Sequence, residues 1–157
     1  QQLPKEQFSL QAASTEIARM NTVRILTQAA WQQPALAPTD SQIVFIHGKR
    51  QWVQQIEPQQ QTLHQDRQAQ ENPALENAPT QWELAGTVQL TQTRYLQLSL
   101  DLLLTELARD NPQTGSTMPH LQQYRLQQAQ RIRPDTLVYY DHPLFGALVK
   151  LVEVEQG

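Results

Sequence analysis

The sequence predicts an α+β fold, in which an antiparallel β-sheet carries one amphipathic N-terminal helix packed on one face. Near the N-terminus, apolar residues recur at steps of three and four, which is the spacing of one side of a helix. Over residues 82–104, apolar residues instead occupy nearly every second position, as in a strand with one face against a core. The length of 157 residues suits one domain, so we expect a single domain over residues 1–157.

The first elements are a helix and two strands. The helix is expected over residues 5–21, with an apolar stripe at Leu10, Ala13, Ile17 and Met20. Residues 22–31 and 42–47 are rich in β-branched residues, so they predict two strands, separated by a loop that contains two prolines. A further strand fragment is expected at Trp52 and Val53.

A glutamine-rich stretch follows. Glutamine accounts for 28 of the 157 residues and is densest between positions 51 and 70. Such neutral polar tracts are well solvated and pack poorly. Three prolines and the lack of periodicity extend the same character, so we predict a long Gln-rich loop over residues 54–80.

The alternating segment is the clearest strand signal. Its polar centre at residues 91–93 indicates a bend or the turn of a hairpin, but no glycine supports a tight turn there. One long twisted strand and two strands with a bulge are therefore both left open. Residues 120–132 predict another strand. Residues 137–140 and 144–154 predict a final pair, interpreted as one strand broken at His142–Pro143.

Composition excludes several function classes. The net charge of -3 lacks the basic surplus that nucleic-acid binding needs, and the absence of cysteine excludes disulfides, thiol catalysis and cysteine-based zinc sites. No apolar run is long enough for a transmembrane segment. The four histidines are scattered, without metal-ligand spacing, and no Gly-x-Ser-x-Gly nucleophile motif occurs. We expect no cofactor, no metal and no enzymatic activity.

The adjacent pair Asp141–His142 is the main candidate for catalysis. An aspartate can orient a histidine base, but neighbouring side chains on an extended chain point to opposite faces. Pro143 also favours an extended or turn geometry at His142. We interpret Asp141 as a turn residue and His142 as partly buried.

Arginines and tyrosines give a better case for binding. Arginine offers a planar fork to carboxylates, and tyrosine offers a flat face on which a sugar can stack. The candidates are Arg94, Tyr95, Arg125, Arg131 and Arg133. The same alternation of arginine and glutamine is also typical of a sheet face that is merely solvated, and Trp31, Trp52 and Trp82 are expected to serve packing.

Several motifs together resemble the CsiV family of peptidoglycan-binding proteins from gammaproteobacteria. They are Ala30-Trp-Gln-Gln-Pro34, Trp82-Glu-Leu-Ala-Gly-Thr87, Arg94-Tyr-Leu-Gln97, Asp101-Leu102, Gln130-Arg-Ile-Arg133 and Leu137-Val-Tyr-Tyr-Asp-His-Pro-Leu-Phe-Gly146. The chain departs from the family pattern at Gln97, Gln130 and Val138, where two histidines and an arginine are usual. With the reasoning from side-chain chemistry, the resemblance implies ligand contacts at Arg94, Tyr95, Arg131, Arg133, Tyr139, Tyr140, Asp141 and His142.

The resemblance also implies a function. It predicts a periplasmic, non-enzymatic factor that binds peptidoglycan and supports cell-wall synthesis and cell shape. Its expected partners are a class A penicillin-binding protein and an outer-membrane lipoprotein activator. Because the chain begins at Gln1 rather than Met, we expect a processed piece with any secretory signal upstream. The alternatives are a protein–protein interaction domain of an envelope complex without glycan binding, and a wall-cleaving enzyme.

Overall fold

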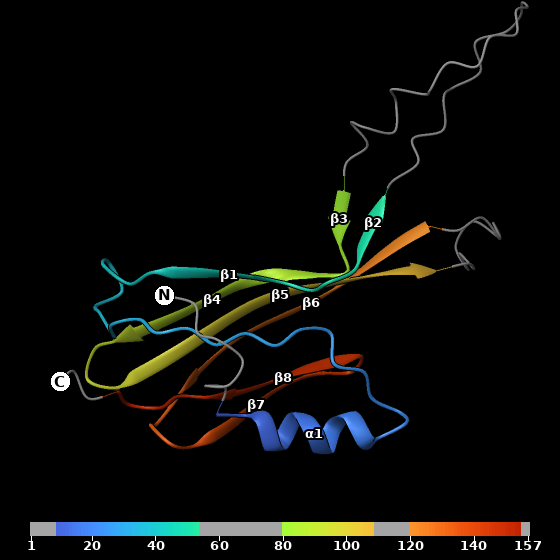
Figure 1. Cartoon of the computed structure of the whole chain (residues 1–157). Helices are drawn as coiled ribbons and strands as arrows, with labels where there is room; N and C mark the ends of the chain where they lie inside the picture. The colour runs from blue at the N-terminus through green and yellow to red at the C-terminus, as the bar shows by residue number, and fades with distance from the viewer. Residues whose placement is uncertain (1–8, 54–79, 109–119, 155–157) are drawn as a thin grey trace, which may run out of the picture.

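The computed structural model describes residues 9–53, 80–108 and 120–154, and its centre is a four-stranded antiparallel sheet (Figure 1). The order across this sheet is β1-β4-β5-β6, and its strands are β1 (Ile43–His47), β4 (Leu84–Gln92), β5 (Leu96–Ala108) and β6 (His120–Arg131). Two further antiparallel pairs join β2 (Gln51–Val53) with β3 (Thr80–Trp82), and β7 (Leu137–His142) with β8 (Phe145–Lys150). The predicted antiparallel sheet is confirmed. The predicted Gln-rich loop lies outside the described residues, except for Thr80, which begins β3.

The alternating segment folds as a hairpin of β4 and β5, not as one long strand. Thr93, Arg94 and Tyr95 connect the strands, and the Thr93 backbone N–H donates to the Tyr95 carbonyl oxygen over 3.2 Å. A connection of three residues does not require the Asn-Gly pair of the tightest hairpins. The register pairs Leu84 with Leu104, so the apolar positions of both strands lie on one face.

The core lies between this apolar face and the hairpin of β7 and β8, which Figure 1 shows beneath the sheet. Tyr140 of β7 has no exposed surface, and its hydroxyl donates to the Leu98 carbonyl oxygen over 3.2 Å. The chain reverses at Pro143 and Leu144, so the C-terminal segment forms two paired strands and not one broken strand. The buried apolar side chains of this core are Leu84, Val88, Leu90, Leu98, Leu100, Leu102, Leu126, Ile132 and Tyr140.

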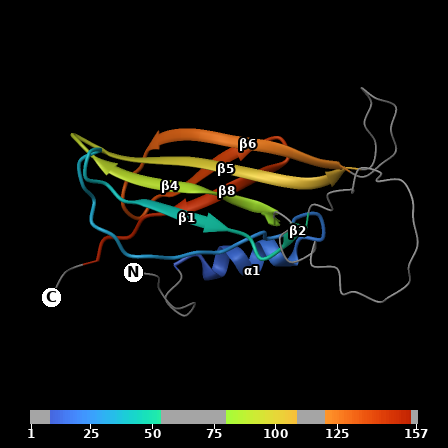
Figure 2. The same ribbon diagram turned by 90° about the horizontal axis from the view of Figure 1, so that it is seen from above.

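The N-terminal elements differ from prediction. The helix α1 (Gln11–Arg19) is shorter than expected, and residues 5–8 lie outside the described range. Figures 1 and 2 place α1 on the hairpin side of the sheet, towards the β1 edge. None of its residues is fully buried, and Met20 is 53% exposed, so the expected packing of an amphipathic stripe on the sheet is not confirmed.

Residues 22–31 form no strand, and that prediction is wrong. The segment is held by side chains in place of a backbone ladder. Leu26 and Trp31 pack against the core, and the Thr27 hydroxyl donates to the His47 carbonyl oxygen over 2.9 Å. Its β-forming composition therefore serves packing and not strand pairing.

The opposite face of the sheet carries no covering layer among the described residues. The hairpin and α1 both lie on the other side, while β2 and β3 rise from one end of the uncovered face (Figure 1). Phe45 of β1 is 80% exposed on this face, and Ile43 is 55% exposed. We call this uncovered surface the open face.

Candidate functional site

The strand register arranges the outward side chains of the open face in rows across the sheet. Residues opposite one another on neighbouring strands lie close enough for their side chains to act together. The first row contains Thr91, Gln97 and Arg131, from β4, β5 and β6. The next three rows are given in the order β1, β4, β5, β6. The second row is Ile43, Gln89, Ser99 and Ala129, the third is Phe45, Thr87, Asp101 and Gln127, and the fourth is His47, Ala85, Leu103 and Arg125.

At the first row, the hairpin connection brings three of the predicted site residues together. The Arg131 guanidinium carbon lies 3.5 Å from the centroid of the Tyr95 ring, and that of Arg94 lies 5.5 Å from it. An arginine over an aromatic face is attracted by the ring and keeps its planar N–H donors available at the rim. We call Arg94, Tyr95 and Arg131 the cation–aromatic cluster. Arg133 is exposed in the segment that follows β6.

Tyr139 and Asp141 lie elsewhere, on the side of the β7–β8 hairpin that faces away from the sheet. The Tyr139 hydroxyl donates to Asp141 Oδ1 over 3.0 Å, which raises the pKa of Tyr139. The tyrosine ring crosses Gly146, where a β-carbon would stand 2.7 Å from Tyr139 Cζ. The predicted ligand contacts therefore do not form one surface. Tyr139 and Asp141 lie on a different layer from Arg131, because Val138 and Tyr140 take the inward positions of β7.

Tyr140 and His142 point towards the sheet. Burial raises the pKa of Tyr140, and the absence of exposed surface removes this residue from any contact surface. The His142 ring lies 6.3 Å from the Tyr124 ring and 5.0 Å from the Phe145 ring, and its Nδ1 accepts from the Leu144 N–H over 3.2 Å. Asp141 and His142 thus face opposite ways, as predicted from their adjacency, and do not form a catalytic pair.

The second and third rows, apart from Phe45, line a shallow depression of about 350 Å³ in the middle of the open face. Asp101 is the carboxylate among the residues that line this depression, and it accepts two hydrogen bonds from Arg125. Arg125 Nε donates to Oδ1 over 2.7 Å, and Nη2 donates to Oδ2 over 2.6 Å. These bonds lower the pKa of Asp101 and neutralise its charge. The other outward side chains of the depression are Ile43, Thr87, Gln89, Ser99, Gln127 and Ala129. Sequence reasoning missed them, although most occupy the polar positions of the alternating pattern.

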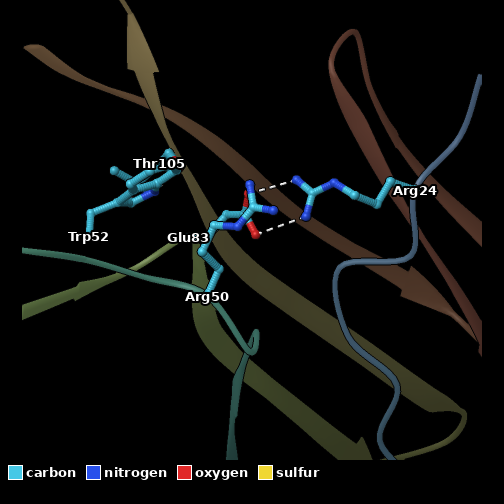
Figure 3. Close-up of polar contacts among 5 residues, drawn as sticks. All are labelled: Arg24, Arg50, Trp52, Glu83 and Thr105. Atoms are coloured by element: carbon cyan, nitrogen blue, oxygen red, sulfur yellow. Dashed lines mark hydrogen bonds and ion pairs between the residues drawn. The ribbon is translucent and has the colours of Figure 1, made fainter. Parts of the chain in front are cut away.

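Glu83 lies between β3 and β4, and its side chain is only 4% exposed (Figure 3). Arg24 donates to both carboxylate oxygens, at 2.6 and 3.1 Å, and Arg50 donates to Oε1 at 3.4 Å. These arginines lower the pKa of Glu83, with the hydrogen bonds from Arg24 as the main cause. Nearby, Trp52 Nε1 donates to the Thr105 carbonyl oxygen over 2.9 Å. This group ties the N-terminal segment and the β2–β3 pair to the sheet.

The tryptophans serve packing, as expected. Trp31 packs against the core and donates from Nε1 to Gln33 Oε1 over 2.7 Å, while Trp82 stacks on His47 at a ring separation of 4.1 Å. In the described ranges, no three His, Asp or Glu side chains gather as metal ligands would. None of the helices in those ranges has the length and apolar character needed to span a bilayer.

A family model described as "Peptidoglycan-binding protein, CsiV" matches residues 1–154. No curated protein and no solved structure matches the chain.

Proposed function

The chain belongs to the CsiV family of peptidoglycan-binding proteins, and we propose that it binds peptidoglycan through the open face. In this proposal the cation–aromatic cluster contacts the carboxylates of the stem peptides. The observation that supports it most directly is the position of Arg131, held 3.5 Å above the Tyr95 ring on an uncovered sheet surface. Stacking on a ring fixes the guanidinium plane before a ligand arrives, which reduces the entropy lost on binding.

The cluster suits carboxylates for an electrostatic reason. Three other arginines on or near the sheet already form ion pairs with carboxylates. Arg125 pairs with Asp101, and Arg24 and Arg50 pair with Glu83. Arg94 and Arg131 instead contact an aromatic ring that carries no charge. The cluster therefore adds positive potential to one end of a face whose middle is electrically balanced.

We further propose a periplasmic, non-enzymatic role that supports a class A penicillin-binding protein and its outer-membrane lipoprotein activator. The family description favours binding over catalysis. The geometry agrees, because Asp141 and His142 diverge and the Asp101 carboxylate is held by Arg125. Tyr139, Asp141 and His142 remain further proposed contacts, separate from the open face, and Arg133 remains a proposed contact in the exposed segment after β6.

Sedimentation with purified sacculi tests the proposal. Arg94→Gln with Arg131→Gln should weaken retention at least about tenfold, because a hydrogen bond between charged groups contributes roughly 1.5–3 kcal/mol. Arg19→Gln with Lys49→Gln is the matched control, since it removes two positive charges at exposed positions outside the cluster. Retention of the cluster variant equal to that of the control contradicts the role of the cluster. No retention of the wild type contradicts peptidoglycan binding itself.

The second candidate is a protein-interaction domain without direct glycan contact. The exposed Ile43 and Phe45 on β1, an outer strand of the sheet, favour it, because such residues often mark protein interfaces. Retention of the wild type on an immobilised penicillin-binding protein or activator, combined with no retention on sacculi, would establish this alternative.

A further inference from the structure

The geometry points to a site for the sugar chain of peptidoglycan in the depression of the open face. This inference rests on the proposed function and assigns different parts of one ligand to two neighbouring surfaces. The cation–aromatic cluster takes the charged stem peptide, and the depression takes the uncharged glycan strand.

The lining of the depression has the hydrogen-bonding character that a sugar chain requires. Thr87 and Ser99 contribute hydroxyls, and Gln89 and Gln127 contribute side-chain amides. Hydroxyl and amide groups both donate and accept, so together they can satisfy sugar hydroxyls and N-acetyl groups in either sense. One of these groups is already oriented, because Gln89 Nε2 donates to the Ser41 hydroxyl over 2.6 Å.

Charge in the depression is balanced, which favours a neutral ligand. Asp101 is the acidic group of this surface, and both of its oxygens accept from Arg125. A ligand with its own carboxylate would have to compete with Asp101 for Arg125 or lie beside a negative charge. A chain of hydroxyl and acetamide groups meets neither penalty, and it can accept from the remaining Arg125 donors.

The shape of the surface supports the same ligand. Ser99 and Ala129 are small and lie side by side in the second row, on β5 and β6, which leaves a hollow beside the longer side chains of Gln89 and Gln127. Phe45 stands directly opposite Thr87 at the β1 side and is 80% exposed. An exposed ring beside amide and hydroxyl groups gives the apolar face of a sugar, or the methyl of an acetamide, a surface to cover.

The two surfaces are adjacent, so one ligand can reach both. Gln97, opposite Arg131, and Ser99, in the depression, are two positions apart along β5. Two residues of a strand span roughly 7 Å. A sugar chain in the depression therefore places its stem peptide within reach of the cluster, without any change in the sheet.

The experiment compares two ligands. One is intact sacculi, and the other is stripped strands, which are glycan strands from which an amidase has removed the stem peptides and whose freed lactyl carboxylates have been converted to neutral amides. The test variant is Thr87→Val with Gln127→Met, which removes two hydrogen-bonding groups while keeping the side-chain lengths and strand-compatible residues. It should bind stripped strands about tenfold more weakly than wild type, since each lost neutral hydrogen bond costs roughly three- to tenfold. Gln123→Met is the control, on the same face of β6 but outside the depression. It should bind as wild type does.

Phe45→Ala is an independent variant, because this exposed ring contributes little to the core. It should also weaken binding to stripped strands, with an unchanged unfolding midpoint. Wild type that binds intact sacculi but not stripped strands overturns the glycan site and leaves the proposed function standing. Equal binding of stripped strands by wild type and both depression variants overturns the site as well. Wild type that is not retained on intact sacculi overturns the proposed function and this inference together.

Discussion

Replacing Glu83 by glutamine tests how the N-terminal segment is attached to the sheet. The Glu83 carboxylate is nearly buried and accepts from Arg24, in the segment after α1, and from Arg50, directly before β2 (Figure 3). The amide of Glu83→Gln has almost the same shape but carries no charge. The change therefore removes the electrostatic attachment and leaves the packing nearly intact.

The expected loss follows from the contacts. Each hydrogen bond between charged groups contributes roughly 1.5–3 kcal/mol, and Arg24 makes two of them with Glu83. Both arginines are more than half exposed, so water compensates them after the change. We expect Glu83→Gln to lower the free energy of unfolding by about 2 kcal/mol. Arg24→Gln should cost more, about 3 kcal/mol, because it leaves a nearly buried carboxylate with only the longer contact to Arg50.

Urea unfolding of the two single variants and the double variant measures this coupling. If the groups act as a pair, the double variant loses about 3 kcal/mol, well below the roughly 5 kcal/mol sum of the single losses. Additive losses would refute the proposed attachment. Arg19→Gln is the control, because its contact with Glu16 is an exposed ion pair within α1, and it should cost less than about 0.5 kcal/mol.

Three further predictions concern stability. The pKa of Glu83 is lowered from its usual 4.5, so the stabilisation by its carboxylate is present above that pH and is lost as the pH falls below it. The difference in free energy of unfolding between wild type and Glu83→Gln should therefore vanish in acid unfolding titrations. Tyr140→Phe should lower the free energy of unfolding by about 1 kcal/mol, and an unchanged urea midpoint would contradict the hydrogen bond to Leu98. Gly86→Ala should cost about 3 kcal/mol, because its β-carbon would stand 2.7 Å from Leu102 Cα and closer still to the Asp101 carbonyl oxygen. Gly48→Ala, with its nearest neighbours at 3.5 Å, should unfold nearly as wild type does.

The strands of the sheet could be predicted because their alternation is local. The apolar residues stand at even-numbered positions both before and after Thr93, and the register pairs these positions with one another. The pattern therefore identified the buried face correctly whether or not the chain turned at Thr93. Residues 22–31 show the limit of such reasoning. β-branched residues favour an extended backbone, but a strand also needs a neighbouring strand with which to form hydrogen bonds. Whether such a neighbour is present depends on the whole fold.

The candidate site also has features that local sequence predicts and features that only the whole fold determines. Adjacency was enough to show that Asp141 and His142 point apart. No local pattern could show that Tyr139 and Arg131 lie on different layers, because that depends on the direction in which the β7–β8 hairpin folds back on the sheet. Phe45 was missed since exposure of an apolar strand residue cannot be distinguished from burial by residue type alone.

The arginines show most clearly how strand register decides which side chains can bind a ligand. Arg125 lies opposite Leu103, so Asp101 is its diagonal neighbour on the same face and accepts hydrogen bonds from its Nε and Nη2. Arg131 lies opposite Gln97, where no carboxylate competes, and the hairpin connection brings Tyr95 beneath it. Both arginines lie on β6, and both side chains point outward. A shift of two residues that placed Asp101 opposite Ala129 would make Arg131 its diagonal neighbour in place of Arg125. The binding proposed for the open face therefore depends on register, and a variant that preserves composition but alters register should lose that binding.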